Sequence, residues 1–270
     1  MKKILLVIYL LSYLSAFSQE NYLAKSKEAL QKNEIKEAIA WADKAIERDS
    51  LQSDNYLQRG LCLYAFSQYD TALKDYTKAI SLNMNNKEAF YNRGVLYYWL
   101  DKDSLALKDF QQAILVDDKD ARSHTALGVL YVKMANGGNQ KYVSLAQKSY
   151  EKAIEVNSNY ASAYYNLALL LAEEKPKESL FYLEKQLVIT KDADGLLLKG
   201  IILGDLKNYQ EALSALEEAE KLKPADYHIY AEKAWVLWKT KKKKEACESW
   251  RKAKNLGDVE AEVWLKKYCK

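Results

Sequence analysis

Histidine and cysteine are scarce in this chain, and so are the residue clusters that a metal site needs. Among 270 residues there are two histidines and three cysteines. The histidines, His124 and His228, belong to no shared motif. A metal site requires several His, Cys or carboxylate side chains at clustered spacing, and no such cluster is visible. We therefore expect neither a metal nor a cofactor.

Recognisable catalytic motifs are also absent. The sequence has no glycine-rich phosphate loop, no GxSxG elbow and no Cys/His arrangement. Adjacent carboxylates such as Asp117-Asp118 and Glu173-Glu174 fall at the ends of expected helices, where solvated charge accounts for them. Without a constellation of catalytic groups, we expect a protein that is not an enzyme.

No excess of one charge marks the chain. Lysine and arginine number 41 against 37 acidic residues, which gives a formal net charge of +4. A nucleic-acid-binding protein usually carries a basic stripe, so we expect no nucleic-acid partner. With 29% charged and 49% hydrophobic residues, the composition is typical of an ordinary soluble helical protein.

The apolar run at the start of the chain is short. Met1-Lys2-Lys3 precedes ILLVIYLLSYL, and the small residues of Ser15-Ala16-Phe17-Ser18 follow. This order is typical of a secretory signal peptide over residues 1–18, cleaved after Ser18. The alternative is an anchor in the inner membrane, but the run is shorter than the roughly 20 residues that a spanning helix needs. We expect a mature chain of residues 19–270 in the periplasm or outside the cell, with no stable membrane span.

A period of 34 residues organises the rest of the chain. Gly60, Gly94 and Gly128 are spaced by 34, and the alanine pairs 72/106 and 79/113 keep the same step. Such a period predicts a solenoid of repeats. Within each repeat, two apolar runs of helical spacing are separated by a short polar break. A glycine inside a helix costs about 1 kcal/mol relative to alanine, so we expect each of these glycines to allow a close helix contact.

The pattern within one repeat is a large residue, a small residue four positions later, and then Ala, an aromatic residue and Ala before a turn. Repeat two shows it in Tyr56, Gly60, Leu63, Ala72, Tyr76 and Ala79. Repeat six, with leucine in place of the aromatic residue, shows it in Leu196, Gly200, Leu203, Ala212, Leu216, Ala219 and Pro224. This pattern resembles the tetratricopeptide repeat family. The resemblance implies an all-α fold, a right-handed α-solenoid of about seven helix-turn-helix repeats, and a non-catalytic scaffold that binds a protein or peptide partner.

The repeats are expected at residues 19–52, 53–86, 87–120, 121–160, 161–192, 193–226 and 227–257, with a capping helix at 258–269. The capping helix carries an apolar stripe that covers the otherwise exposed face of the last repeat. Asp70-Thr71 and Asp103-Ser104 are expected to cap the second helices of their repeats. Repeat four has six extra residues, which we assign to a longer loop over Met134–Tyr142; a loop that touches a ligand is the alternative.

Cysteine usage leaves two alternatives open. Cys247 takes a position that is leucine in other repeats, so a buried apolar role is the simplest interpretation. In an oxidising compartment, a disulfide between Cys247 and Cys269 would instead attach the capping helix to the last repeat.

Aromatic residues on the first helices of the repeats are the candidate partner-binding residues. At 3.6 residues per turn, one stripe of these helices is expected to face a concave groove. We predict that a partner is anchored there by Tyr64, Tyr91, Tyr98, Trp99, Tyr165, Trp235 and Trp238. The alternative is that these rings pack against the next repeat.

The predicted function is a scaffold of the bacterial cell envelope that binds an extended peptide or a helix in this groove. The second hypothesis is an envelope glycan or cell-wall binding module, in which the same rings stack on sugars.

Overall fold

The computed structural model describes residues 22–136 and 138–269, and these ranges contain helices and turns but no strand. The all-α expectation is therefore confirmed. None of the helices in these ranges is both long enough and apolar enough to cross a membrane. The predicted signal peptide, residues 1–18, lies outside the described residues.

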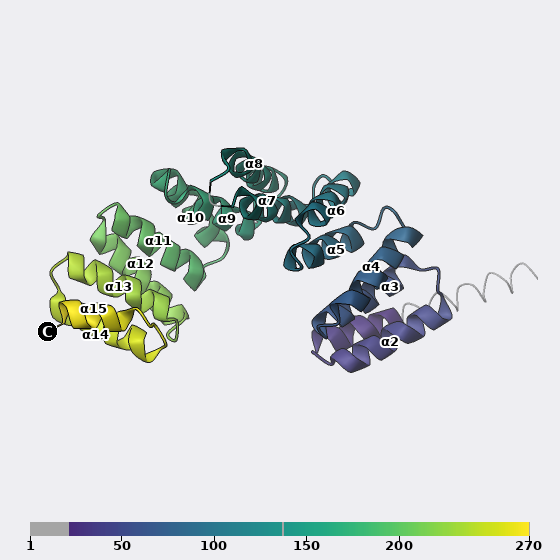
Figure 1. The fold of residues 1–270 in the computed structure, drawn as a ribbon, viewed down its shortest axis with the longest axis horizontal. Coiled ribbons are helices and arrows are strands. Elements are labelled where there is room, and N and C mark those ends of the chain that lie inside the picture. Colours follow the sequence, from purple (N-terminus) through teal and green to yellow (C-terminus); the bar gives the residue numbers. More distant parts are fainter. Residues whose placement is uncertain (1–21, 137, 270) are drawn as a thin grey trace, which may run out of the picture. The chain divides into compact units, whose positions relative to one another are not determined.

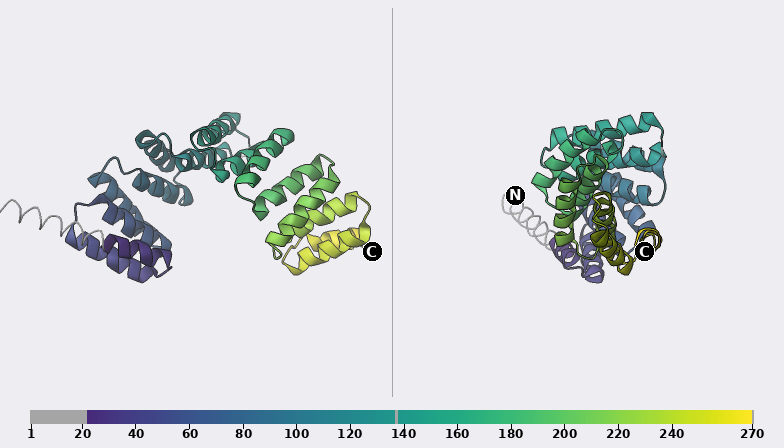
Figure 2. Two further views of the ribbon diagram at one scale, coloured as in Figure 1. Left: turned by 180° about the vertical axis from the view of Figure 1, so that it is seen from behind. Right: turned by 90° about the vertical axis from the view of Figure 1, so that its left-hand side faces the viewer.

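The chain divides into two compact units, residues 1–136 and 137–270. In both, successive helices form antiparallel pairs that pack side by side (Figures 1 and 2). The first unit contains a helical stretch at 22–31, α2 (Ile35–Arg48), α3 (Ser53–Ala65), α4 (Tyr69–Leu82), α5 (Lys87–Trp99), α6 (Asp103–Val116) and α7 (Ala121–Ala135). The second contains α8 (Gln140–Val156), α9 (Ala161–Leu171), α10 (Pro176–Ile189), α11 (Ala193–Asp205), α12 (Tyr209–Leu222), α13 (Tyr227–Lys239), α14 (Lys243–Asn255) and α15 (Ala261–Tyr268).

In three helix pairs, α3/α4, α5/α6 and α11/α12, a glycine of the first helix packs closely against a large residue of the second. A Cβ atom added to Gly60 would lie 2.6 Å from the Tyr76 ring, and one added to Gly200 would lie 2.6 Å from Leu216. Tyr76 and Leu216 are fully buried. The alanines that flank these large residues are fully buried too, so the two helices of a repeat meet along a seam of small residues.

The turn inside a repeat has the same backbone conformation in five repeats. A residue other than glycine takes a positive φ of 55–65° there, and these residues are Asn33, Ser67, Asp101, Lys207 and Lys241. The amide after it donates to a carbonyl of the preceding helix, as Gln68 does to Leu63. This bond satisfies a helix-end carbonyl and sends the chain back antiparallel.

This turn explains why the predicted helix caps are wrong. Helix α4 begins at Tyr69, with Gln68 rather than Asp70 at the capping position, and α6 begins at Asp103, with Lys102 before it. Neither capping residue uses its side chain. The two aspartates lie in the first turn of their helices instead, where the helix dipole favours negative charge.

The extra residues of repeat four lengthen helices more than they lengthen a loop. Helices α7 and α8 have 15 and 17 residues, against 13 and 14 in α5 and α6, so helices take up five of the six. Residues 136–139 form the connection, one residue longer than 100–102. The prediction of a long loop over Met134–Tyr142 is wrong, because the first and last of these residues continue helices.

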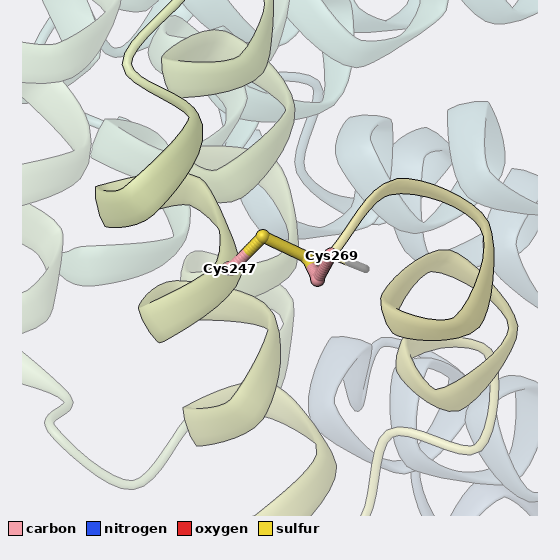
Figure 3. The surroundings of a disulfide bond; sticks show 2 residues. All are labelled: Cys247 and Cys269. Carbon is pink, nitrogen blue, oxygen red and sulfur yellow. A yellow bond between two sulfur atoms is a disulfide. The ribbon is translucent and has the colours of Figure 1, made fainter.

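The disulfide alternative for the cysteines is the one found in the structure. Cys247 on α14 is bonded to Cys269 at the end of α15 (Figure 3). Cys62 is a free, buried cysteine whose sulfur lies 3.6 Å from the Ser26 hydroxyl oxygen. Burial raises the pKa of this thiol, which suits a packing role.

Two glycines of first helices provide a matched test of the close contact. At Gly94 an added Cβ would lie 2.9 Å from the Phe110 ring, whereas at Gly204 it would make only an ordinary 3.4 Å contact with Val236. We expect Gly94→Ala to lower the free energy of unfolding by about 1–3 kcal/mol through overpacking. Gly204→Ala should be neutral or stabilising by up to about 1 kcal/mol, since alanine is the better helix former. Thermal melts followed by circular dichroism will measure both, and equal effects would contradict the close-contact account.

Candidate functional site

The predicted partner-binding residues fall into three structural settings. Tyr64, Tyr91, Tyr98 and Trp99 belong to the first unit, Tyr165 lies beside a polar cavity in the second unit, and Trp235 and Trp238 lie under the last helix of the second unit. The seven predicted residues therefore differ in their surroundings.

In the first unit, two of the predicted rings are each covered by a cation from α7. The Arg122 guanidinium lies 5.0 Å from the centre of the Tyr91 ring, and the Lys133 ammonium lies 4.7 Å from the centre of the Tyr98 ring. Both are cation–π distances. Because the cations come from the following repeat, they attach α7 to α5 and restrict the movement of both rings.

Carboxylates hold these two cations in place. Arg122 pairs with Glu88 of α5, and the Lys133 ammonium lies 2.7 Å from Asp101 and 2.8 Å from Asp103. Lys133 also donates to the Tyr98 carbonyl oxygen at 3.1 Å. Hydrogen bonds to Asp101 and Asp103 raise the pKa of Lys133 further above neutral pH.

Trp99 is the exposed member of the group. Its side chain is 67% exposed, and its ring meets Tyr98 edge to face, with 5.6 Å between the ring centres. Tyr64, one repeat earlier than Tyr98, is 36% exposed and contacts Tyr69. The first unit therefore presents an exposed indole beside a fixed phenol at the end of α5.

Sequence reasoning missed a buried ion pair that orients this helix. Arg93 forms two hydrogen bonds to Asp109 of α6, at 2.7 and 2.8 Å, and Arg59 binds Asp75 in the same way. Burial opposes the charge of Arg93, but the bond to Asp109 raises its pKa overall. The signal was available, since each arginine precedes a repeat glycine and each aspartate follows sixteen residues later.

In the second unit, Tyr165 lines a polar cavity of about 350 Å³. The other lining residues are Ala161, Ser162, Asn166, Gln186, Thr190, Asp192 and Asp194. Burial and the charges of Asp194 and Asp192 raise the pKa of Tyr165. The acids already have partners, since Asp192 accepts from the Gln186 side chain at 2.6 Å and Asp194 pairs with Lys223 at 2.6 Å.

Trp235 and Trp238 lie against α15. The Trp235 ring centre is 4.7 Å from that of Trp264, and the Trp238 ring centre is 4.6 Å from that of Tyr268. Both rings belong to the core of the last repeat. Contact with the capping helix, which is the packing alternative stated for the stripe, accounts for their size without a partner.

No group of three or more metal-ligating side chains occurs within the described ranges. His124 has a ring nitrogen 2.8 Å from the Asp118 carbonyl oxygen, and the His228 ring lies against Tyr227. Each histidine is thus explained by local contacts.

Removing one partner of the Arg93–Asp109 pair should be costly. Asp109→Ala leaves the Arg93 side chain, which is only 16% exposed, without its carboxylate partner, and we expect a loss of about 3 kcal/mol in the free energy of unfolding. The double variant Arg93→Met/Asp109→Ala should be more stable than the single variant, because no unpaired charge remains. Urea denaturation of Asp109→Ala, of Arg93→Met and of the double variant will test this, and a double variant as unstable as the sum of the two single changes would contradict it.

Comparison with known proteins places two segments in repeat families. The TPR repeat model matches residues 60–101, and a second tetratricopeptide repeat model matches residues 197–256. Among the curated proteins, none matches the sequence significantly.

Several solved structures share the fold, an all-α solenoid of helical repeats. PilF of Pseudomonas aeruginosa is 20% identical, with 80% of this chain and 96% of that chain covered and a TM-score of 0.69. A tetratricopeptide repeat protein from Parabacteroides merdae is 19% identical over 94% and 99% of the two chains, with a TM-score of 0.64. YrrB, described as a TPR protein with an unusual peptide-binding site, is 22% identical over 71% and 97%, with a TM-score of 0.57. At these identities the likeness concerns the fold alone.

Proposed function

The chain is a tetratricopeptide repeat protein and thereby a protein–protein interaction scaffold, and we propose that it acts in the bacterial cell envelope without catalysing a reaction. We propose further that it binds an extended peptide or a helix of a partner protein. The binding surface is formed by Tyr98 and Trp99 at the end of α5, together with Tyr91 about two turns earlier on the same helix.

The exposure of Trp99 is the observation that supports this proposal. A tryptophan that is 67% exposed leaves a large apolar ring in water, and tryptophan and tyrosine are enriched among the residues that carry binding energy. Lys133 and Arg122 already fix the two neighbouring tyrosines. A partner would therefore bind a surface that loses little side-chain entropy on association.

A peptide or helix is the partner class that this surface fits. Tyr91 and Tyr98 lie seven residues apart on α5, which is about two helical turns, and Trp99 follows Tyr98. An elongated partner can therefore contact the rings in succession along the helix. YrrB has the same fold, and a peptide-binding site is ascribed to it. This likeness supports the class of partner but identifies no sequence.

The test begins with capture of envelope proteins on the immobilised protein and identification by mass spectrometry. The affinity of the captured partner is then measured for Tyr98→Ala/Trp99→Ala and for Leu115→Ala, a control residue on α6 that is 77% exposed. We expect the double variant to lose at least 10-fold in affinity, as removal of two anchoring rings does, and the control to bind normally. Unchanged affinity in a double variant with an intact helical circular-dichroism signal would refute the assignment.

We propose that residues 1–18 direct export and are removed. Two lysines, a short apolar run and small residues at the exit support this, and the Cys247–Cys269 disulfide suits an oxidising compartment.

Expression of the whole sequence in a Gram-negative bacterium will test export. We expect the protein in the periplasmic fraction with Gln19 as its first residue, by mass spectrometry of the intact chain. Retention of Met1 on a membrane-bound protein would favour the anchor alternative, and retention of Met1 on a cytoplasmic protein would exclude export.

A further inference from the structure

The last repeat carries an aromatic face against which α15 packs. This aromatic face consists of Trp235 and Trp238 of α13 and Trp250 of α14. From α15, Trp264 and Tyr268 lie on it, and their ring centres are 4.6–6.0 Å from those of the three tryptophans. A face that carries three tryptophans is rich in the residue type that most often dominates protein interfaces.

Apart from its contacts with these rings, helix α15 buries little surface. It has eight residues, of which only Ala261 is buried, and a helix this short is unstable on its own in water. It follows α14 through residues 256–260, where Gly257 takes a φ of +107°, a conformation that favours glycine. The connection can therefore act as a hinge.

The disulfide attaches the C-terminal end of α15 to α14. Cys247 lies on α14 and Cys269 at the end of α15, 22 residues later (Figure 3). With the bond intact, an opened α15 remains tied at both ends, so the open state gains little conformational entropy. Cleavage of a cross-link that closes a loop of this length should increase the population of the open state roughly 100-fold or more.

We propose that the disulfide is a redox latch over this face, and that the face opened by reduction binds helix α15 of a second copy of the chain. The occupant follows from the contacts already present, because Trp264 and Tyr268 of any copy fit the same three indoles. Exchange of an identical element between copies is a low-cost route to a dimer.

The opening step is a thiol–disulfide exchange with a dithiol reductant. A thiolate of the reductant attacks the sulfur of Cys269, which is less buried than Cys247, and the sulfur–sulfur bond breaks. Cys247 leaves as a thiolate and takes up a proton. The second thiol of the reductant then releases Cys269, so the protein disulfide gains two electrons and the dithiol becomes a disulfide.

Hydrogen exchange will test the latch on the whole protein. After reduction with dithiothreitol, confirmed by thiol counting, and at a dilution at which the protein stays monomeric, we expect protection of the α15 amides to fall roughly 100-fold, with protection in α3–α6 unchanged. Cys62→Ser should respond like the wild type, which would exclude Cys62 as the sensor. Unchanged protection of α15 after complete reduction would overturn the proposal.

A cross-linking experiment will test the occupant. Cys62→Ser/Cys247→Ser protein is mixed with Cys62→Ser/Cys269→Ser protein in a glutathione redox buffer. Neither can form the internal bond, so a heterodimer linked from Cys269 of one copy to Cys247 of the other, identified by peptide mass, reports the exchanged α15. Adding Trp264→Ala to the copy that retains Cys269 should lower the yield several-fold. Absence of the heterodimer, or a yield unaffected by Trp264→Ala, would overturn the proposal.

Discussion

The close contact between a small residue of one helix and a large residue of its partner is the constraint on which the repeats depend. Gly60 meets Tyr76, Gly94 meets Phe110 and Gly200 meets Leu216, at distances that leave no room for a Cβ atom. This contact sets how near the paired helices lie and how they are rotated. The small residue recurs with the repeat, and each pair therefore offers its neighbour a surface of similar shape, which is the condition for stacking.

Polar interactions add to this contact by fixing the rotation of helices and the positions of side chains. The Arg93–Asp109 pair fixes the rotation of α5 against α6, and Lys133 and Arg122 then fix two rings of α5 from the next repeat. The exposed Trp99 is thereby placed beside a rigid neighbour rather than on a mobile surface. A binding surface of this kind comes from successive repeats together, since the rings and the cations that hold them belong to different ones.

The last repeat shows what happens where the stacking stops among the described residues. No first helix follows α14 with the usual small-residue seam; α15, with eight residues, covers three tryptophans instead. Such a short helix has too little contact surface to be held by packing in the way that an internal helix is, and a covalent bond supplements it. Aromatic side chains thus have two roles in this fold. Those of α5 bind a partner, as proposed above, and those of α13 pack against α15.

The sequence by itself determined the all-α repeat fold, the family resemblance and the positions of the close contacts, because helical periodicity and a step of 34 residues are local properties of the chain. It also identified the aromatic residues, but not their surroundings. The cation over Tyr98 comes from Lys133, 35 residues away, and the cover of Trp235 from Trp264. Only the tertiary structure decided which rings are exposed, which cysteines pair and where the extra residues of repeat four lie. The physical reason is that exposure and pairing depend on neighbours brought together by packing between helices, whereas helix formation and the close contacts within a repeat depend on residues already near in sequence.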